Sequence, residues 1–199
     1  MIKLYHATRT RSFRIVWLLE ELGIPYELDK MPFVPPQTPF AQASPFGKFP
    51  AIEDGELAMF ESGAILEYVI ERYGNSRLAP PLGSPLRGPY LQWLHFSEAT
   101  AFPPIAEMIR HTTFKPESER IPAVVADARG RAQVTLGVLE KALGDKDYLI
   151  GDFSGADVMM GFTLVAAKLL GALDDRFPNL QAYLARLEAR PAFQKAAAA

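Results

Sequence analysis

The chain has 199 residues, of which 49% are hydrophobic and 22% are charged, and its formal net charge is −2. These proportions are close to globular averages and exclude an intrinsically disordered protein. Without a basic excess, we expect binding neither to nucleic acid nor to an anionic membrane. The absence of cysteine excludes disulfides, thiolate metal ligands and a protein thiol nucleophile. The three histidines, His6, His95 and His111, lack the spacing of a zinc site, so we expect no metal.

The first 75 residues carry strand and helix signals in alternation. The helical apolar pattern that begins at Ser12 stops at Gly23, a typical C-cap. Asp54-Gly55 lies between two short apolar segments and indicates a hairpin, and Ser62 is placed to cap the helix that follows. The predicted elements are strands at 2–6, from 26 onward, and at 51–53 and 57–60, with helices at 12–22 and 62–73.

The second part of the chain is separated from the first by a proline-rich stretch, residues 78–85, which predicts a linker. The predicted helices beyond it run roughly over 86–112, 116–143, 154–170 and 178–190, with a short tail helix. Ser154 and Asp157 predict a capping box. The most apolar stretch, 158–173, is interrupted by Lys168 and is shorter than the ~20 residues that a bilayer requires. We therefore expect a buried helix there, and a soluble cytoplasmic protein without a targeting segment.

Three segments carry a family resemblance: residues 44–51 (SPFGKFPA), 61–65 (ESGAI) and 151–157 (GDFSGAD). Together they resemble the motifs of the cytosolic glutathione S-transferase family. Residues 10–23 and 94–98 are similar to its serine/threonine-type bacterial and fungal branch. The resemblance covers nearly the whole chain, with the motifs in the expected order.

The resemblance implies both a fold and an activity. The fold is an α/β N-terminal thioredoxin-like domain (βαβ-ββα) at 1–76, a linker at 77–86 and an all-α C-terminal helical domain at 87–199. The activity is detoxification by transfer of the glutathione thiolate to a small hydrophobic electrophile, with glutathione as co-substrate. Relatives form homodimers, and Met59, Phe60 and Tyr68 would suit a two-fold contact here.

The resemblance also implies the glutathione site. Phe49 would precede a cis Pro50 and offer its backbone to the cysteinyl part of glutathione, like an added strand. Glu61 and Ser62, at a helix N-terminus, would hold the γ-glutamyl group. The remaining binding residues expected are Lys48 for a carboxylate, Arg11 for an anion contact, and Gln37 as a neutral donor where many relatives carry a loop cation.

Catalysis requires the thiol of glutathione to become a thiolate. Lowering a thiol pKa from about 8.5 to about 6.5 needs roughly 2.7 kcal/mol. A hydroxyl donor supplies about 1.5–3 kcal/mol and a helix N-terminus about 0.3–1 kcal/mol, so the two together suffice. Thr10 stands four residues before Arg14, where serine-type members carry their catalytic serine. Ser12 and Tyr5 are alternative hydroxyls, and a backbone amide or an arginine is a further one.

The electrophile pocket is expected along the first helix of the second part, where Glu98 and Phe102 share a helical stripe that is equally typical of a core. Pro103 and Pro104 should kink this helix. The sequence leaves the electrophile unspecified. Glutathione-dependent peroxide reduction or dehalogenation would use the same thiolate, and a non-catalytic glutathione-binding or scaffold protein would keep the same fold.

Overall fold

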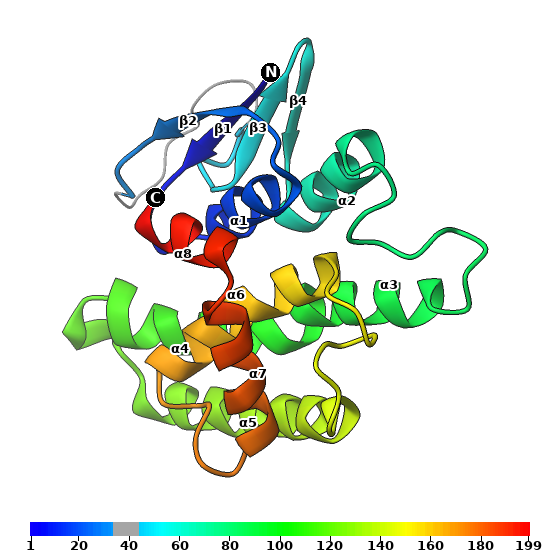
Figure 1. Ribbon diagram of the computed structural model, residues 1–199. Coiled ribbons are helices and arrows are strands. Elements are labelled where there is room, and N and C mark those ends of the chain that lie inside the picture. Colours follow the sequence, from blue (N-terminus) through cyan, green and yellow to red (C-terminus); the bar gives the residue numbers. More distant parts are fainter. Residues whose placement is uncertain (34–43) are drawn as a thin grey trace. The chain divides into compact units, whose positions relative to one another are not determined.

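The computed structural model describes residues 1–33 and 44–199. The chain divides into two compact units, Met1–Pro80 together with Glu188–Ala199, and Pro81–Leu187. Figure 1 shows a sheet with helices in the first unit and helices alone in the second. This is the expected pair of a thioredoxin-like α/β part and an all-helical part. The domain limits at residues 76 and 87 stay predictions.

The first unit is a four-stranded mixed sheet with helices. Its elements are β1 (Ile2–His6), α1 (Ser12–Leu22), β2 (Tyr26–Lys30), β3 (Ala51–Asp54), β4 (Leu57–Phe60), α2 (Ser62–Tyr73) and α8 (Pro191–Ala198). The strand order is β2-β1-β3-β4. β1 runs parallel to β2 and antiparallel to β3, and β3 pairs antiparallel with β4. The parallel β1–β2 pair requires a crossover, which α1 provides. The predicted hairpin forms, but its turn is Gly55-Glu56, because Asp54 is still part of β3 and pairs with Leu57.

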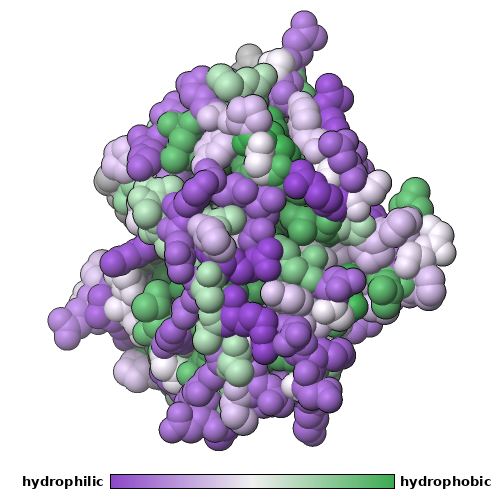
Figure 2. All heavy atoms as spheres, viewed as in Figure 1, coloured by the Kyte–Doolittle hydropathy of each residue, from purple (hydrophilic) through white to green (hydrophobic). Residues whose placement is uncertain are grey.

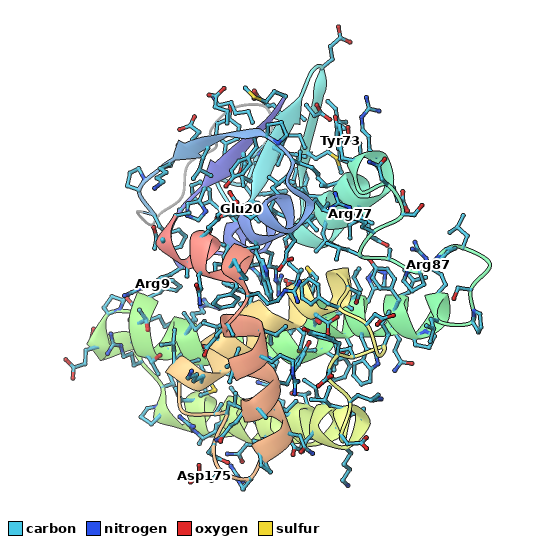
Figure 3. All side chains as sticks on the ribbon, viewed as in Figure 1. Arg9, Glu20, Tyr73, Arg77, Arg87 and Asp175 are labelled. Carbon is cyan, nitrogen blue, oxygen red and sulfur yellow. The ribbon has the colours of Figure 1, made fainter. Side chains whose placement is uncertain are left out.

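The helix α1 is the centre of the first unit. Its apolar face is buried, and the helix ends at Gly23, whose φ of 65° lies in the left-handed region that glycine tolerates. α8 packs along α1: the Phe193 ring lies edge-on to Trp17 at a centroid distance of 4.9 Å. Arg77, labelled in Figure 3, donates to the carbonyl oxygens of Leu22 (2.7 Å) and Gly74 (3.2 Å), at the C-terminal ends of α1 and α2. A cation at that position favours the negative end of a helix dipole.

The second unit is helical throughout its regular structure. Its elements are α3 (Arg87–Phe96), the π-helical segment η1 (Ser97–Ala101), α4 (Phe102–Ile109), the π-helical segment η2 (Arg110–Phe114), the 3₁₀ turn η3 (Glu117–Glu119), α5 (Pro122–Leu143), α6 (Gly155–Leu169) and α7 (Pro178–Glu188). The single helix predicted over 86–112 is therefore interrupted. Pro103 and Pro104 lie in the first turn of α4 and have no backbone N–H, so the hydrogen-bond ladder changes register just before them.

The helix α6 forms the core of the second unit, because twelve of its fifteen residues are buried. Its capping box is confirmed: the Ser154 hydroxyl oxygen accepts from the Asp157 N–H, and the Asp157 carboxylate accepts from the Ser154 N–H at 2.8 Å. The carboxylate also accepts from the Ser154 hydroxyl at 2.8 Å. On the face shown in Figure 2, hydrophilic side chains predominate, with apolar ones interspersed. Within the described ranges, every helix falls short of the length and apolarity needed to cross a membrane.

Candidate functional site

The turn between β1 and α1 brings two hydroxyls together. Thr10 Oγ1 lies 2.7 Å from the Ser12 Oγ and 2.7 Å from the Ala7 carbonyl oxygen, to which it donates. Ser12 is fully buried, whereas Thr10 is half-buried. α1 begins at Ser12 with Arg11 at the N-cap position and no side-chain capping bond. Thr10 is therefore the hydroxyl of this pair that keeps access to solvent.

His6 extends this group of hydroxyls into the core. Its Nδ1 lies 2.9 Å from Ser12 Oγ, and the side chain is only 2% exposed. Burial, and secondarily the positive charge of Lys30, lower the pKa of His6 below its ordinary value. The imidazole is thus neutral at pH 7, and hydroxyl, hydroxyl and neutral imidazole form one hydrogen-bonded chain.

Tyr5 is nearby but already engaged. Its hydroxyl donates to the Glu53 carboxylate at 2.9 Å. Burial raises the pKa of Tyr5, and the Glu53 carboxylate raises it further. An O–H that already donates to a carboxylate is poorly placed to donate to a second anion.

The loop before β3 carries the cis peptide bond expected between Phe49 and Pro50. Ser44, which is buried, fixes this loop: its hydroxyl donates to the Lys48 carbonyl (2.8 Å) and accepts from the Lys48 N–H (2.9 Å). The role of Ser44 was not predicted, although a serine four residues before Lys48 in an S-P-x-G turn is a typical signal for such a bond. The Lys48 side chain is exposed.

Packing places this loop against the first turn. Phe49 belongs to a small buried cluster with Tyr5, Ala7 and Ala51. Ala7 is also the residue whose backbone binds Thr10 and Ser12. The cluster therefore joins the cis-proline loop to the hydroxyl pair.

The N-terminus of α2 forms the third part of the site. Our prediction that Ser62 caps this helix was wrong: the N-cap residue is Glu61, which makes no side-chain capping bond, and Ser62 is the first helical residue. Its hydroxyl instead accepts from Arg14 Nη1 at 3.0 Å, and both side chains are buried. This bond connects α1 to the start of α2, a link that sequence spacing did not reveal. Glu61 is exposed, and its φ of 76° is a left-handed value that is rare for glutamate.

Three further predicted residues lie in the described parts of the molecule, and one lies outside them. Arg11 is half-buried at the start of α1. Gln37 lies outside the described residues. Glu98 and Phe102 are in the second unit, where Phe102 is buried and stacks on Phe162 at a centroid distance of 5.7 Å. In the parts of the chain that the structure covers, no group of three histidine or acidic side chains could hold a metal ion.

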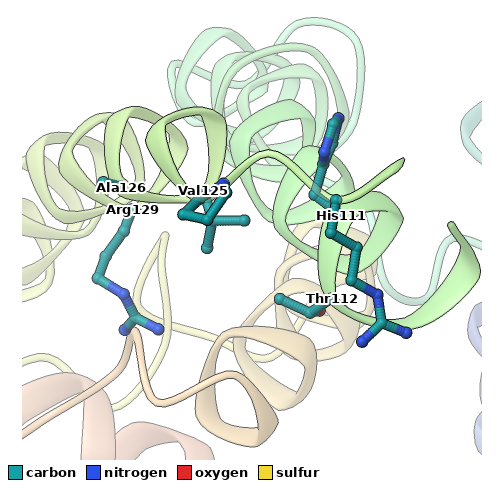
Figure 4. Close-up of a pocket in the computed structure, with 7 residues that line it drawn as sticks. His111, Thr112, Val125, Ala126 and Arg129 are labelled. Carbon is teal, nitrogen blue, oxygen red and sulfur yellow. The ribbon is translucent and has the colours of Figure 1, made fainter. Parts of the chain in front are cut away.

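A cavity of about 480 Å³ lies in the second unit and is drawn in Figure 4. The residues around it are His111, Thr112, Arg120, Pro122, Val125, Ala126 and Arg129. Its polar groups serve the chain itself: Arg129 donates to the carbonyls of Leu170 and Gly171, and His111 Nδ1 accepts from the Ile121 N–H. We therefore assign this cavity no ligand.

The chain matches two family models that together cover most of its length. The glutathione S-transferase N-terminal domain matches residues 1–71, and the C-terminal domain matches residues 102–191. Glutathione S-transferase 3 of Schizosaccharomyces pombe is 30% identical over 99% of this chain and 87% of its own length.

Solved structures show the same likeness. A glutathione transferase family member from Pseudomonas fluorescens, crystallised with two glutathione bound, is 29% identical with a TM-score of 0.84, covering 98% of this chain and 92% of that one. A glutathione transferase homologue from Lodderomyces elongisporus, with two glutathione per subunit, is 26% identical with a TM-score of 0.88, covering 99% and 97%.

Proposed function

The chain belongs to the glutathione S-transferase family, and we propose that it conjugates glutathione, through its thiolate sulfur, to a hydrophobic electrophile. The observation that carries the proposal is the convergence of three segments in the first unit. Ala7 and Phe49 pack in one cluster, and Arg14 donates to Ser62. The thiol proton is released to water, and the thiolate's electron pair forms the new carbon–sulfur bond. The electrophile either loses a leaving group such as a halide with its bonding pair, or, if it is an activated double bond, takes up a proton on the neighbouring carbon.

Binding of glutathione falls to the cis-proline loop and the start of α2. Phe49 lies in the loop just before β3 and precedes the cis Pro50, and we assign to its backbone the binding of the cysteinyl part of glutathione like an added strand. The first amides of α2 and the exposed Glu61 offer opposite charges to the α-carboxylate and α-amino group of the γ-glutamyl residue. Lys48, Arg11 and Gln37 complete the proposed set as donors to the other carboxylate and to the sulfur.

Thr10 is the hydroxyl that we assign to the thiolate, which agrees with the serine/threonine-type branch. Two observations support it over the alternatives: Ser12 is fully buried, and the Tyr5 hydroxyl donates to Glu53. The dipole of α1 adds a smaller favourable contribution at the same place. Glu98 and Phe102 remain our proposal for the electrophile side.

Substitutions at two residues, Thr10 and Glu61, separate activation of the thiol from binding of the peptide. In Thr10→Val, the pKa of bound glutathione should rise by about one to two units, and the rate near pH 6.5 should fall roughly ten- to a hundredfold. Thr10→Ser should keep most of the activity. In Glu61→Gln, glutathione affinity should fall about tenfold while the thiol pKa stays as in the parent. The measurements are pH–rate profiles with a generic aromatic electrophile and calorimetric titration with glutathione.

The same experiment can contradict the proposal. A Thr10→Val profile that matches the parent would move the role to Ser12, Tyr5 or a backbone amide. Failure of the parent to bind millimolar glutathione would favour a scaffold protein of this fold. Turnover of a hydroperoxide or a halogenated substrate in place of the aromatic electrophile would favour the peroxidase or dehalogenase alternative.

The proposal includes a homodimer in the cytoplasm. Phe46 and Phe60 form an exposed aromatic pair, 64% and 40% accessible, with ring centroids 5.8 Å apart. Together with the partly exposed Met59, this pair suits an isologous contact between two copies. A monomeric mass by light scattering at micromolar concentration would disprove the dimer.

A further inference from the structure

In the hydrogen-bonded series His6–Ser12–Thr10, counting donors and acceptors determines which group donates in each bond. Each hydroxyl has one proton to donate and two lone pairs to accept with. A neutral imidazole donates through one nitrogen and accepts through the other. The donors in this series decide whether the Thr10 hydroxyl can donate its proton to a ligand.

The environment of His6 fixes its tautomer. Its Nε2 is buried and has no hydrogen-bond partner among the residues that the structure describes. A buried orphan N–H is rarer in folded proteins than a buried acceptor without a partner. The proton therefore belongs on Nδ1, 2.9 Å from Ser12 Oγ, and His6 donates to Ser12.

Because it accepts from His6, Ser12 donates its own proton to the next group. Its Oγ accepts from His6 Nδ1 and also from the Ala7 N–H at 3.3 Å, so both lone pairs are occupied. Its own proton must then be donated. Of the two acceptors within reach, Thr10 Oγ1 at 2.7 Å is much closer than the Ala7 carbonyl oxygen at 3.3 Å.

Thr10 is the last member of this hydrogen-bonded series. Its Oγ1 accepts from the Ser12 hydroxyl and, at 3.4 Å, from the Ser12 N–H. We propose that His6 and Ser12 are positioning residues which fill both acceptor sites of Thr10 Oγ1, so that the Thr10 hydroxyl meets glutathione only as a donor. This proposal rests on the function proposed above, in which Thr10 contacts the sulfur.

A donor-only hydroxyl discriminates between the two forms of the ligand. A thiol S–H needs an acceptor, and Thr10 has none to offer, whereas a thiolate needs a donor, which is what Thr10 presents. Without a ligand the Thr10 hydroxyl donates to the Ala7 carbonyl oxygen, and the two oxygens lie 2.7 Å apart. A charged acceptor binds it about twice as strongly as a neutral carbonyl, so rotation toward the thiolate is favourable. A chain of aligned hydrogen bonds also strengthens its last member by about 10–30%.

The test is a double-mutant cycle read by the pKa of bound glutathione, measured from the ultraviolet absorbance of its thiolate. Ser12→Ala should raise that pKa by about 0.3–0.7 unit, so that the ionised fraction falls two- to fivefold below the pKa. In a Thr10→Val background, Ser12→Ala should add no further shift. Glutathione affinity at a pH well below the thiol pKa should match the parent in all these variants.

Variants of His6 test the first donor of the hydrogen-bonded series. His6→Asn keeps an N–H donor near the position of Nδ1 and should retain the parental thiol pKa. His6→Leu removes the donor and should give a shift like that of Ser12→Ala. If Ser12→Ala does not fold, this His6 pair carries the test alone.

Each outcome separates the two proposals. A shift with Thr10→Val and none with Ser12→Ala or His6→Leu overturns the positioning role and leaves the proposed function standing. No shift with Thr10→Val contradicts the assignment of Thr10 itself. Equal shifts by Ser12→Ala in the parental and Thr10→Val backgrounds would mean that Ser12 acts on the sulfur without Thr10, which also overturns the chain.

Discussion

Two helices of this protein, α1 and α6, begin at hydrogen-bonded networks that contain a serine, and the two networks end differently. At α6, the buried Asp157 carboxylate accepts from the N–H and hydroxyl of Ser154, the Leu149 N–H and the Tyr183 hydroxyl. At α1, the network ends on a half-buried hydroxyl at Thr10 and on a His6 nitrogen without a partner in the described residues. A network that is buried throughout serves stability, whereas one that ends on a half-buried hydroxyl, which can turn from the Ala7 carbonyl oxygen to another acceptor, can serve a ligand.

The largest expected effect is at the closed network. Asp157→Ala leaves four buried donors without their acceptor and should lower the free energy of unfolding by about 3–5 kcal/mol. Chemical denaturation measures it. Asp174→Asn is the matched control, because Asp174 pairs with Arg176 at the surface and its loss should leave stability essentially unchanged. A loss as small as the control's would mean that water replaces the carboxylate.

The next effect is a pH dependence that belongs to the open network. Burial, together with Lys30, lowers the pKa of His6 in the native state below 6.5. Below pH 6.5 the unfolded chain therefore binds a proton that the native state does not. The His6 contribution to stability is fully present above pH 6.5 and is lost as the pH falls from 6.5 toward the native pKa, by up to about 1.4 kcal/mol per pH unit. In His6→Asn, stability should fall less steeply over this interval, and a slope identical to the parent's would contradict a neutral buried imidazole.

The smallest effect compares the two hydroxyls directly. Ser154→Ala removes a helix cap and should cost about 1 kcal/mol of stability, with the thiol pKa unaffected. Thr10→Val should cost less stability, since Thr10 is half-buried and lies outside α1, yet it should change the thiol pKa most. Denaturation curves and thiolate titrations of the two variants settle the order. If Thr10→Val proved the more destabilising, the distinction between the networks would fail.

Local sequence patterns were sufficient for the elements of the first unit and for the α6 box. Gly23, Asp54-Gly55 and the Ser154–Asp157 spacing each determine a local backbone geometry, and local geometry can be predicted from neighbouring residues. The cis bond at Phe49-Pro50 came from the family resemblance instead. The long helix over 86–112 was predicted too simply, because apolar periodicity does not register the change to π-type hydrogen bonding.

Side-chain hydrogen bonds between separate elements were the part that sequence reasoning missed. The Arg14–Ser62 bond joins residues 48 positions apart, and Ser62 was taken for a cap because serine at a helix start usually is one. His6 was considered only as a metal ligand and proved to be the partner of Ser12. Whether two such side chains meet depends on the path of the β1–α1 turn and on the packing of α1 beside α2, which no spacing rule along the sequence contains.

The position of α8 has a consequence for how the molecule is made. The first compact unit is interrupted in sequence, since its last helix is encoded by the final residues of the chain. During synthesis, Phe13 and Trp17 on α1 cannot contact the ring of Phe193 until more than a hundred further residues have been added. Domains otherwise fold in the order in which they leave the ribosome. Here the unit that starts first is completed last, so a chain that stops at the linker would leave Phe13 and Trp17 without their aromatic partner, and we expect it to be less stable as a separate domain.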